Sequence, residues 1–391
     1  MPRLDYRTAG ESHGPALIVL IEGLPADLPF DPDAINAELR RRQGGYGRGA
    51  RMRIEHDTVR VLSGLRRGRT IGSPLALQIE NRDSRIDQAP EINRPRPGHA
   101  DLAGAIKWLT ADCRNTLERA SARETAARVA AGAAARCLLD QFAIDPVGFV
   151  SAIGGETAQV SESLTPRELR TLRDANDVYT PDPNAVSRMQ GVIRRAKEQR
   201  DSVGGVVEVR VFGVPIGLGS CMSWQDKLDG RLMQAVGSIQ AIKGVEIGLG
   251  FEAAARPGSA VHDPIDFDPA SRTSPAFGFS RRSNHAGGLE GGMTNGQPLV
   301  IRAAMKPIST LLQGMDSVNL LTLQPERSDY ERSDVCAVPA ASVVAETVVA
   351  FEVARAFLEK FAGDTVQEVR AAYEHYASAV RRRSEPRTET R

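Results

Sequence analysis

The segment from Arg40 to Arg53 holds the residues whose types and spacing point most directly to chemistry. Its sequence, RRRQGGYGRGARMR, has six arginines and four glycines, although the formal net charge of the chain is only +1. A guanidinium group makes bidentate, charge-assisted hydrogen bonds to phosphate or carboxylate, and glycines let the backbone approach a ligand closely. Two interpretations follow: a loop that binds a multiply charged anion, or an Arg/Gly segment that binds nucleic acid.

Two of the six histidines lie in polar turns with glycine beside them. His13 lies between Ser12 and Gly14, and His99 lies two residues before Asp101. Histidine titrates near neutral pH, so both are candidate proton donors or acceptors beside a bound anion, although an isolated histidine is more often structural. No two histidines have the spacing of a metal site, so we expect no bound metal.

Three further segments could contact an anion. Ser121 and Arg123 lie at an expected helix N-terminus, where free N–H groups favour negative charge, although Ser121 could simply cap the helix. Lys306–Thr310 supplies one cation and two hydroxyl groups. Arg332 and Asp334 could form an exposed ion pair of little energetic value. Together, these residues predict an enzyme that handles a phosphorylated small molecule and uses two histidines for proton transfer.

Composition and missing motifs narrow the function classes. The 50 lysines and arginines almost balance the 49 acids, which argues against a general nucleic-acid or membrane-surface protein. No apolar run is long enough to span a bilayer, and we expect no signal peptide. The four cysteines form no CxxC pair and are predicted to be buried thiols in a reducing cytoplasm. Neither a P-loop nor a Rossmann glycine motif is present in a suitable context.

The elements that must position these residues can be predicted from caps and periodicity. An N-cap at Asp31 and proline at the next position begin a helix that delivers the arginine segment. We expect helices at 31–42, 125–142, 166–174, 184–200, 231–240 and 341–361. We expect strands at 16–21, 60–63, 74–79, 203–214, 245–255 and 298–305. The many alanines and Gly132 of the second helix indicate close packing against a neighbouring element, and 256–296 is predicted to be a long loop with a specific path.

Eight segments resemble the chorismate synthase family, and they occur in the family's order. They are Gly10–Gly14, Arg40–Met52, Arg94–Asp101, Arg119–Thr125, Gln240–Gly248, Ser283–Gly296, Lys306–Thr310 and Arg332–Ala337. The resemblance implies an α+β fold: a β-α-β sandwich with two antiparallel sheets in the interior and helices outside. We expect one catalytic domain over 1–380, followed by a polar tail over 381–391.

The resemblance also implies a reaction, a cofactor and partners. The reaction is the anti-1,4-elimination of phosphate and a ring hydrogen from 5-enolpyruvylshikimate 3-phosphate, which gives chorismate. It would use reduced FMN without net redox change, with NADPH as one source of reducing power. A cytoplasmic homotetramer supplied by an external flavin reductase is expected. The alternative from another class is a nucleic-acid-binding protein that uses residues 40–53.

Site residues are carried over from the resemblance one position at a time. His13 would protonate the departing phosphate, His99 would protonate the reduced flavin, and Asp334 would help the flavin accept the ring proton. Substrate would be bound by Ser12, Arg42, Arg48, Arg123 and Arg332, and Arg42 and Arg48 would also bind NADPH. The flavin would contact Arg119, Ala120, Ser121, Gln240, Ala241, Gly291, Lys306, Pro307, Ile308, Ser309, Thr310 and Arg332. One departure is Leu102, where the family usually has tyrosine.

Overall fold

The computed structural model describes residues 3–49, 55–329, 331 and 333–383. Arg332 and the last part of the arginine segment therefore lie outside the described residues, as does 384–391 of the expected tail. Residues 381–383, which we expected in that tail, are the last turn of a helix, α9 (Val366–Arg383).

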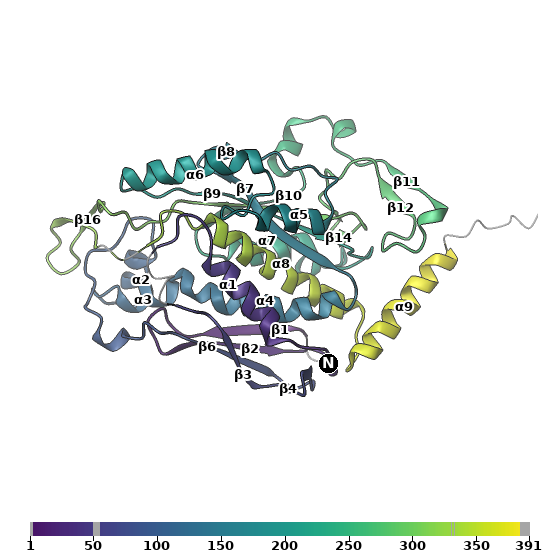
Figure 1. Cartoon of the computed structure of the whole chain (residues 1–391), viewed down its shortest axis with the longest axis horizontal. Helices are drawn as coiled ribbons and strands as arrows, with labels where there is room; N and C mark the ends of the chain where they lie inside the picture. The colour runs from purple at the N-terminus through teal and green to yellow at the C-terminus, as the bar shows by residue number, and fades with distance from the viewer. Residues whose placement is uncertain (1–2, 50–54, 330, 332, 384–391) are drawn as a thin grey trace, which may run out of the picture.

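Two antiparallel sheets form the framework (Figure 1). The four-stranded sheet has the order β1 (Asp5–Ala9), β2 (Ala16–Glu22), β6 (Leu75–Glu80), β3 (Val59–Ser63). The five-stranded sheet has the order β10 (Ile242–Ile247), β15 (Leu299–Met305), β9 (Gly205–Phe212), β7 (Asp145–Ile153), β8 (Glu156–Thr157). Alternate residues of β2 and β6 are buried, as expected for a sheet with one face on the core.

Helices lie between the two sheets, which corrects the expectation that all helices lie outside. The layer contains α1 (Pro32–Gln43), α4 (Thr125–Asp140) and α8 (Val338–Lys360) (Figure 1). Helix α4 packs on β2 and on α8, and α8 packs on β7 and β9. Because α8 is apolar around nearly its whole circumference, it is stable only where both sides are covered. The other face of β7 is covered by α5 (Pro166–Asp174) and α6 (Pro183–Glu198).

The predicted close packing of the 125–142 helix is confirmed at Gly132. A Cβ atom at this position would lie 2.0 Å from the carbonyl oxygen of Thr347 on α8. Alanines of α4 fill the rest of the contact and are almost completely buried. The two helix backbones can therefore approach closely only because the side chains between them are small.

Several boundaries differ from the predictions. The strand expected at 245–255 ends at Ile247 because Gly248 and Gly250 adopt positive φ, and 250–255 forms a 3₁₀ helix. The helix expected at 231–240 is α7 (Leu228–Gly237), which begins and ends three residues earlier. Helices α2 (Asp101–Lys107) and α3 (Arg114–Ala120) were not predicted.

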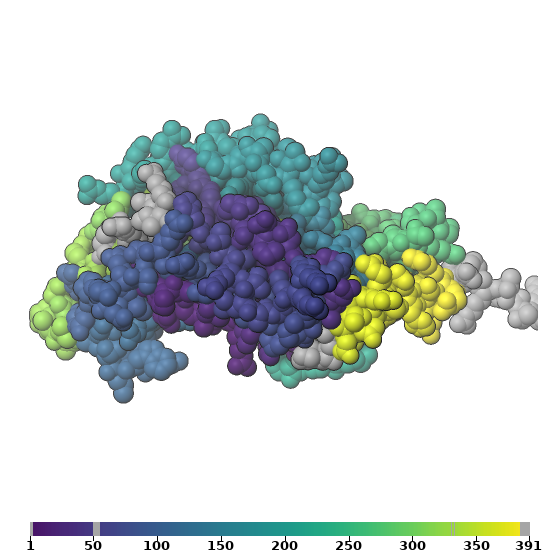
Figure 2. Space-filling view, turned by 60° about the horizontal axis from the view of Figure 1, so that its bottom comes forward, coloured from purple at the N-terminus to yellow at the C-terminus, as the bar shows by residue number. Residues whose placement is uncertain are grey.

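The 256–296 region follows a specific path built from short hairpins. They are β11 (Ile265–Phe267) with β12 (Phe279–Arg281) and β13 (Leu289–Glu290) with β14 (Met293–Thr294). Elsewhere, β4 (Leu65–Arg66) pairs with β5 (Arg69–Thr70), and β16 (Asp316–Val318) with β17 (Pro325–Arg327). The β16–β17 hairpin lies at the same end of the molecule as α2 and α3, whereas α9 and β11–β12 lie at the opposite end (Figures 1 and 2).

Two further observations concern solvent and membrane. None of the helices in the described ranges is both long enough and apolar enough to cross a membrane. The cysteines only partly match the prediction of buried thiols, because Cys113 and Cys336 are buried and Cys137 is half-buried, whereas Cys221 is exposed.

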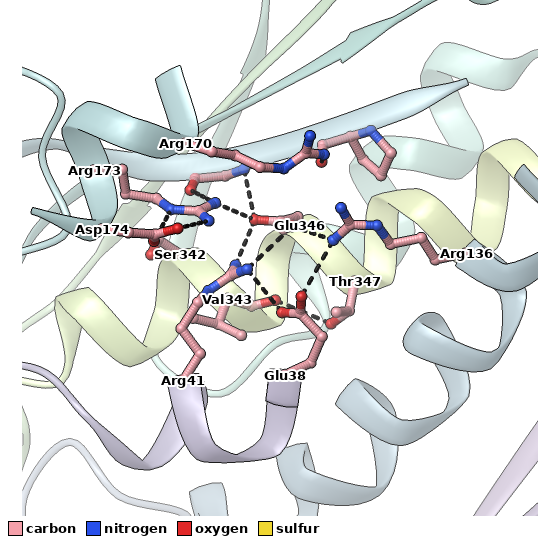
Figure 3. Close-up of polar contacts among 12 residues, drawn as sticks. Glu38, Arg41, Arg136, Arg170, Arg173, Asp174, Ser342, Val343, Glu346 and Thr347 are labelled. Atoms are coloured by element: carbon pink, nitrogen blue, oxygen red, sulfur yellow. Dashed lines mark hydrogen bonds and ion pairs between the residues drawn. The ribbon is translucent and has the colours of Figure 1, made fainter. Parts of the chain in front are cut away.

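A buried carboxylate ties the helical layer to the five-stranded sheet. Glu346 of α8 has no exposed side-chain surface and accepts hydrogen bonds from three guanidinium groups (Figure 3). These come from Arg41 of α1 at 2.5 Å, Arg136 of α4 at 3.0 Å and Arg173 of α5 at 3.0 Å. The backbone N–H of Gly148 in β7 donates a fourth bond at 2.8 Å. Five elements therefore meet at one side chain.

The arginines keep this carboxylate ionised. Burial alone would raise the pKa of Glu346, but the three arginines outweigh it and lower the pKa to about 2. The Arg41 side chain ties the end of α1 to this cluster. A second bond holds the same residue, because the Tyr179 hydroxyl donates to the Arg41 carbonyl at 2.9 Å. The next residue, Arg42, points away from the cluster and lines a cavity on the other side.

Replacing Glu346 with glutamine should destabilise the protein strongly. Removing one partner from a buried ion cluster leaves uncompensated charges, which costs about 3–5 kcal/mol. Urea unfolding at pH 7 measures this loss. Asp174→Asn is the matched control, since Asp174 pairs with Arg173 but is half exposed, and its loss should be below about 1 kcal/mol.

The same pair of variants predicts a difference in pH dependence. Glu346 has a lower pKa folded than unfolded, so its contribution to stability is present above about pH 4.5 and is lost as the pH falls toward 2. The wild type should lose stability over this window, and Glu346→Gln should lose less. Parallel pH profiles for the two proteins would contradict the assignment.

Candidate active site

A cavity of about 550 Å³ opens where segments from both halves of the chain meet. Its walls come from the β1–β2 turn, the end of α1 with its following loop, the 96–100 turn and the start of α4. The opposite walls come from the α7–β10 turn, the segment after β15 and the first turns of α8. Ala337, Ala341 and Val344 share one face of α8 toward the cavity.

Most of the residues singled out in the sequence line this cavity. They are Ser12, His13, Arg42, Arg48, His99, Ser121, Arg123, Gln240, Ala241, Lys306, Ile308, Ser309, Thr310 and Asp334. Four of the described candidates are not among the lining residues: Arg119, Ala120, Gly291 and Pro307. Arg332 lies outside the described residues. Leu102 is about half exposed on α2.

Two of the four candidates that do not line the cavity have well-defined positions elsewhere. Arg119 is exposed and donates to the carbonyl oxygens of Gly10 and Thr8. Gly291 lies in the β13–β14 turn, next to the N-terminal end of α7, where Leu228 N–H donates to the Gly292 carbonyl. The cavity lies beyond the other end of α7, and a helix of that length spans about 15 Å. Within this chain, Gly291 is therefore remote from the cavity.

His13 is held by a buried carboxylate. Both oxygens of Glu118 lie close to His13 Nδ1, at 3.0 and 2.9 Å, and one also accepts the His13 backbone N–H at 2.9 Å. Burial raises the pKa of Glu118, but hydrogen bonds from His13 and Arg114 lower it below its ordinary value. The Glu118 carboxylate is therefore ionised, and it orients the ring of a residue that lines the cavity.

His99 has a similar partner. Its Nδ1 is hydrogen-bonded to the carboxylate of Asp101, which is completely buried at the start of α2. Arg96 also bonds Asp101, through Nε at 2.8 Å, and reaches Thr310 through Nη1 at 2.9 Å. Burial raises the pKa of Asp101, but the bonds from His99 and Arg96 outweigh it and hold that pKa well below its usual range.

Three of the four described arginines of the 40–53 segment, Arg41, Arg42 and Arg48, bind acids inside the protein, whereas Arg40 is exposed. Arg42 donates to Thr125 Oγ1 at 2.9 Å and lies 3.3 Å from Asp57, which also binds Arg123 at 2.6 Å. Burial lowers the pKa of Arg42 to about 9, with Asp57 opposing the shift. Arg48 binds Asp334 at 2.5 Å. Arg42 and Arg48 form a wall of the cavity and not a solvated arm.

Two glycines of the 40–53 segment allow its backbone to pass close to α8 and to Asp334. Gly45 has φ +101°, and a Cβ atom there would lie 2.6 Å from Pro339 Cβ at the start of α8. The backbone N–H of Gly49 donates to Asp334 at 2.6 Å. The loop therefore packs on α8 and holds both oxygens of the Asp334 carboxylate.

A second cationic wall lacks acidic partners. Lys306 and Lys243 line the cavity near each other, and neither forms an ion pair with a carboxylate of the described residues. Burial lowers the pKa of Lys306, and the positive charge of Lys243 lowers it further. Ser309 and Thr310 lie beside them in the lining. Two unneutralised ammonium groups with adjacent hydroxyls can bind a phosphate group.

One buried acceptor in the cavity has no partner among the described residues. Gln240 donates through Nε2 to Glu124 at 3.2 Å, but no donor of the described residues reaches its buried Oε1. A buried acceptor without a donor is costly, so a ligand N–H at this position would remove the penalty. The cavity therefore combines cationic walls, two oriented histidines and a free amide oxygen, which suits proton transfer to and from a polyanionic ligand with ring N–H groups.

Reasoning from sequence missed several residues of the site. Glu118, Asp57 and Lys243 had no signal of their own, because their partners are distant in sequence: Glu118 lies 105 residues from His13. Capping of the long helix by Ser121 was the alternative to anion binding at this position. Ser121 instead caps the short 3₁₀ turn at 122–124 that leads into α4, accepting from Arg123 N–H at 3.2 Å.

Removing one charge from the lysine wall should weaken phosphate binding. In Lys306→Gln, affinity for inorganic phosphate at pH 8 should fall about tenfold, equivalent to about 1.4 kcal/mol. The stability of the unliganded variant should not fall, since its repulsion with Lys243 is relieved. Phosphate-dependent thermal shifts measure both quantities, and Lys197→Gln on the exposed face of α6 is the control.

The pH dependence follows from the lowered pKa. Phosphate stays a dianion between pH 8 and 10, whereas Lys306 loses its proton earlier than an ordinary lysine. Phosphate binding by the wild type should weaken over this range more than binding by Lys306→Gln. Equal pH dependence in both proteins would exclude Lys306 as a phosphate contact.

Comparison with known proteins gives one consistent result. A family model described as chorismate synthase matches residues 4–358. Chorismate synthases of Geobacter metallireducens and Desulforamulus reducens are each 54% identical to the chain, covering 97% of it and 99% of their own length. That of Enterococcus faecalis is 50% identical, covering 95% and 98%. A crystal structure of chorismate synthase superposes with a TM-score of 0.80 at 42% identity, covering 98% and 99% of the two chains.

Proposed function

The chain belongs to the chorismate synthase family, and from this premise we propose that it converts 5-enolpyruvylshikimate 3-phosphate to chorismate. The reaction is an anti-1,4-elimination of phosphate and a ring hydrogen, so the protein is a carbon–oxygen lyase acting on a phosphate. The observation that carries the proposal is that His13 and His99, each with a buried carboxylate on Nδ1, line one cavity with cationic walls. Such an elimination needs positioned proton donors beside a departing anion.

Substrate charges are bound by the arginine wall. The substrate carries one phosphate and two carboxylates, and the proposed contacts are Ser12, Arg42, Arg48, Arg123 and Arg332. Arg42 and Arg123 share Asp57, and Arg123 also lies 3.8 Å from the buried Glu55 carboxylate. Both guanidinium groups line the cavity, so they can also donate to an anion there.

The cavity fits reduced FMN as the cofactor. The unpartnered Gln240 Oε1 can accept from a flavin ring N–H, and Lys306, Ser309 and Thr310 can bind the flavin phosphate. The remaining proposed contacts in the lining are Ser121, Ala241 and Ile308. Arg119, Ala120, Pro307 and Arg332 are proposed from the resemblance alone, and Gly291, also expected from it, is remote from the cavity within this chain. The chemistry that reduced FMN would supply is reversible donation of electron density, so that the reaction has no net redox change.

Three side chains would move or hold protons. His13 donates a proton from its ring to the departing phosphate. His99, oriented by Asp101 and Arg96, holds a proton beside the flavin-binding wall. Asp334, held by Arg48 and by the Gly49 N–H, supplies a carboxylate near the flavin where the ring proton is removed.

On the basis of the same resemblance, we also propose an oligomeric state for the protein and a source for its reduced cofactor. The protein acts as a cytoplasmic homotetramer with one catalytic domain over residues 1–380, and a separate reductase supplies reduced FMN. If NADPH is bound, Arg42 and Arg48 are its contacts. The nucleic-acid alternative is disfavoured because Arg41, Arg42 and Arg48 bind internal acids and not solvent.

An anaerobic assay tests the proposed reaction. Purified protein is mixed with chemically reduced FMN and 5-enolpyruvylshikimate 3-phosphate, and chorismate absorbance and phosphate release are followed together. Equal amounts of both products are expected. A folded, FMN-binding protein that forms neither product would show that the fold serves other chemistry. Repeating the assay with oxidised FMN and NADPH separates a bifunctional enzyme from one that depends on an external reductase.

Each histidine variant should lose turnover without losing the cofactor. His13→Ala and His99→Ala should each lower kcat about 100-fold or more, since a positioned acid or base contributes about 10²–10⁴-fold. FMN binding, measured by flavin fluorescence, should persist in His13→Ala. His262→Ala is the control because His262 is exposed and remote from the cavity lining. Unchanged turnover in both variants would remove the histidines from the mechanism.

A further inference from the structure

Glu118 is a fully buried carboxylate that contacts a cavity-lining histidine through three hydrogen-bonding distances of 2.9–3.0 Å. A carboxylate accepts hydrogen bonds and does not donate them, so His13 Nδ1 must carry the hydrogen. His13 Nε2 is then the ring nitrogen that can exchange a proton with a ligand. The pairing therefore selects one tautomer and one ring orientation.

We propose that Glu118 is the positioning residue of His13: it fixes the ring and stabilises the imidazolium from which Nε2 protonates the departing phosphate. The identity of the proton acceptor rests on the proposed function, whereas the pairing itself does not. In this step the Nε2–H bond breaks and a phosphate oxygen gains the proton. The ring becomes neutral and keeps its Nδ1–H bond to Glu118, and a solvent proton restores the imidazolium after phosphate leaves.

The other charged groups around His13 are weaker candidates for this role. Asp83 lies 3.7 Å from His13 Nε2, beyond hydrogen-bonding distance, and it is shared with Arg85 at 2.9 Å. Its side chain is also 20% exposed, whereas that of Glu118 has no exposed surface. A charge without solvent around it is screened less, so Glu118 exerts the stronger field on the ring.

A second ion pair holds Glu118 in place. Arg114, one helical turn earlier on α3, donates to Glu118 at 3.2 Å and to Glu331 at 3.1 Å. Glu331 itself lines the cavity. Arg114 therefore has a carboxylate on either side, and it remains neutralised in part when Glu118 is replaced. This makes a Glu118 variant compatible with a folded protein.

The first measurement follows His13 directly and needs no turnover. Imidazole ¹⁵N–¹H spectra give the tautomer of His13 in the wild type, Glu118→Gln and Glu118→Asp. The Glu118 carboxylate only accepts hydrogen bonds, so the wild type should carry the hydrogen on Nδ1, whereas the amide of Glu118→Gln can also donate and should give a mixture of tautomers. Glu118→Asp keeps the carboxylate and should retain most of the Nδ1–H tautomer.

The second measurement is a double-mutant cycle on phosphate release. Glu118→Gln should lower kcat about 10–100-fold with little change in KM. In the His13→Ala background it should have less than about a twofold effect, because its only catalytic route is through that ring. Asp101→Asn is the matched control: it also removes a carboxylate from a histidine Nδ1, but that of His99, so its effect should persist in the His13→Ala background.

The outcomes separate the two proposals. The same His13 tautomer populations in wild type and Glu118→Gln, or kcat losses that simply multiply in the cycle, would overturn the positioning role. If Glu118→Gln does not fold, the spectra of the wild type and Glu118→Asp still decide it: a hydrogen on Nδ1 in both supports the pairing, and a wild-type ring with its hydrogen on Nε2 alone overturns it. If the wild type forms no chorismate, the proposed function fails, while the spectra continue to test the His13–Glu118 pairing.

Discussion

Burial of the Glu346 carboxylate obliges α1, α4, α5 and β7 to meet at one point on α8. A charge in this position is stable only if its partners are all present, because each missing guanidinium would leave an unneutralised charge in the helical layer. The position of α1 is therefore set by an electrostatic requirement as well as by apolar packing. Since Arg41 lies on the cluster side and Arg42 on the cavity side, fixing the end of α1 also fixes the wall of the site.

The same logic of paired charges extends into the cavity. His13 and His99 have buried carboxylates, and Asp334 has both oxygens occupied by the loop after α1. Orienting each group by a second group reduces the rotamer freedom that a ligand would otherwise have to remove on binding. Within the described part of the chain, Lys306 and Lys243 have no acidic partner and Gln240 Oε1 has no donor, so a ligand can satisfy these groups.

Local signals in the sequence predicted most elements but not their layering. Some signals depend only on neighbouring residues and could be recognised in the sequence. They are the Asp31 cap of α1, the alternating burial pattern of β2 and β6, and the small residues of α4. The position of α8 between two sheets depends on the elements that cover its two sides, and these are distant in sequence. Its apolar circumference could still have predicted that both sides are covered. Helix α9 had a legible start as well, a Thr365 hydroxyl bound to Glu368 N–H, and it was overlooked.

The residues of the candidate site also fall into two groups: those that their local sequence identifies, and those that only folding brings to the site. His13 and His99 could be selected because glycines and acids lie beside them in sequence, but Glu118 could not, because folding alone brings it to His13. The Arg40–Arg53 segment shows the limit most clearly, since its composition suits a nucleic-acid arm and a buried wall equally. Its neutralising acids, Glu346, Asp57 and Asp334, come from distant parts of the chain. An arm requires arginines that are free to meet phosphates in solvent. Here Arg42 is desolvated enough to lower its pKa to about 9, so it can act only on an anion that enters the protein.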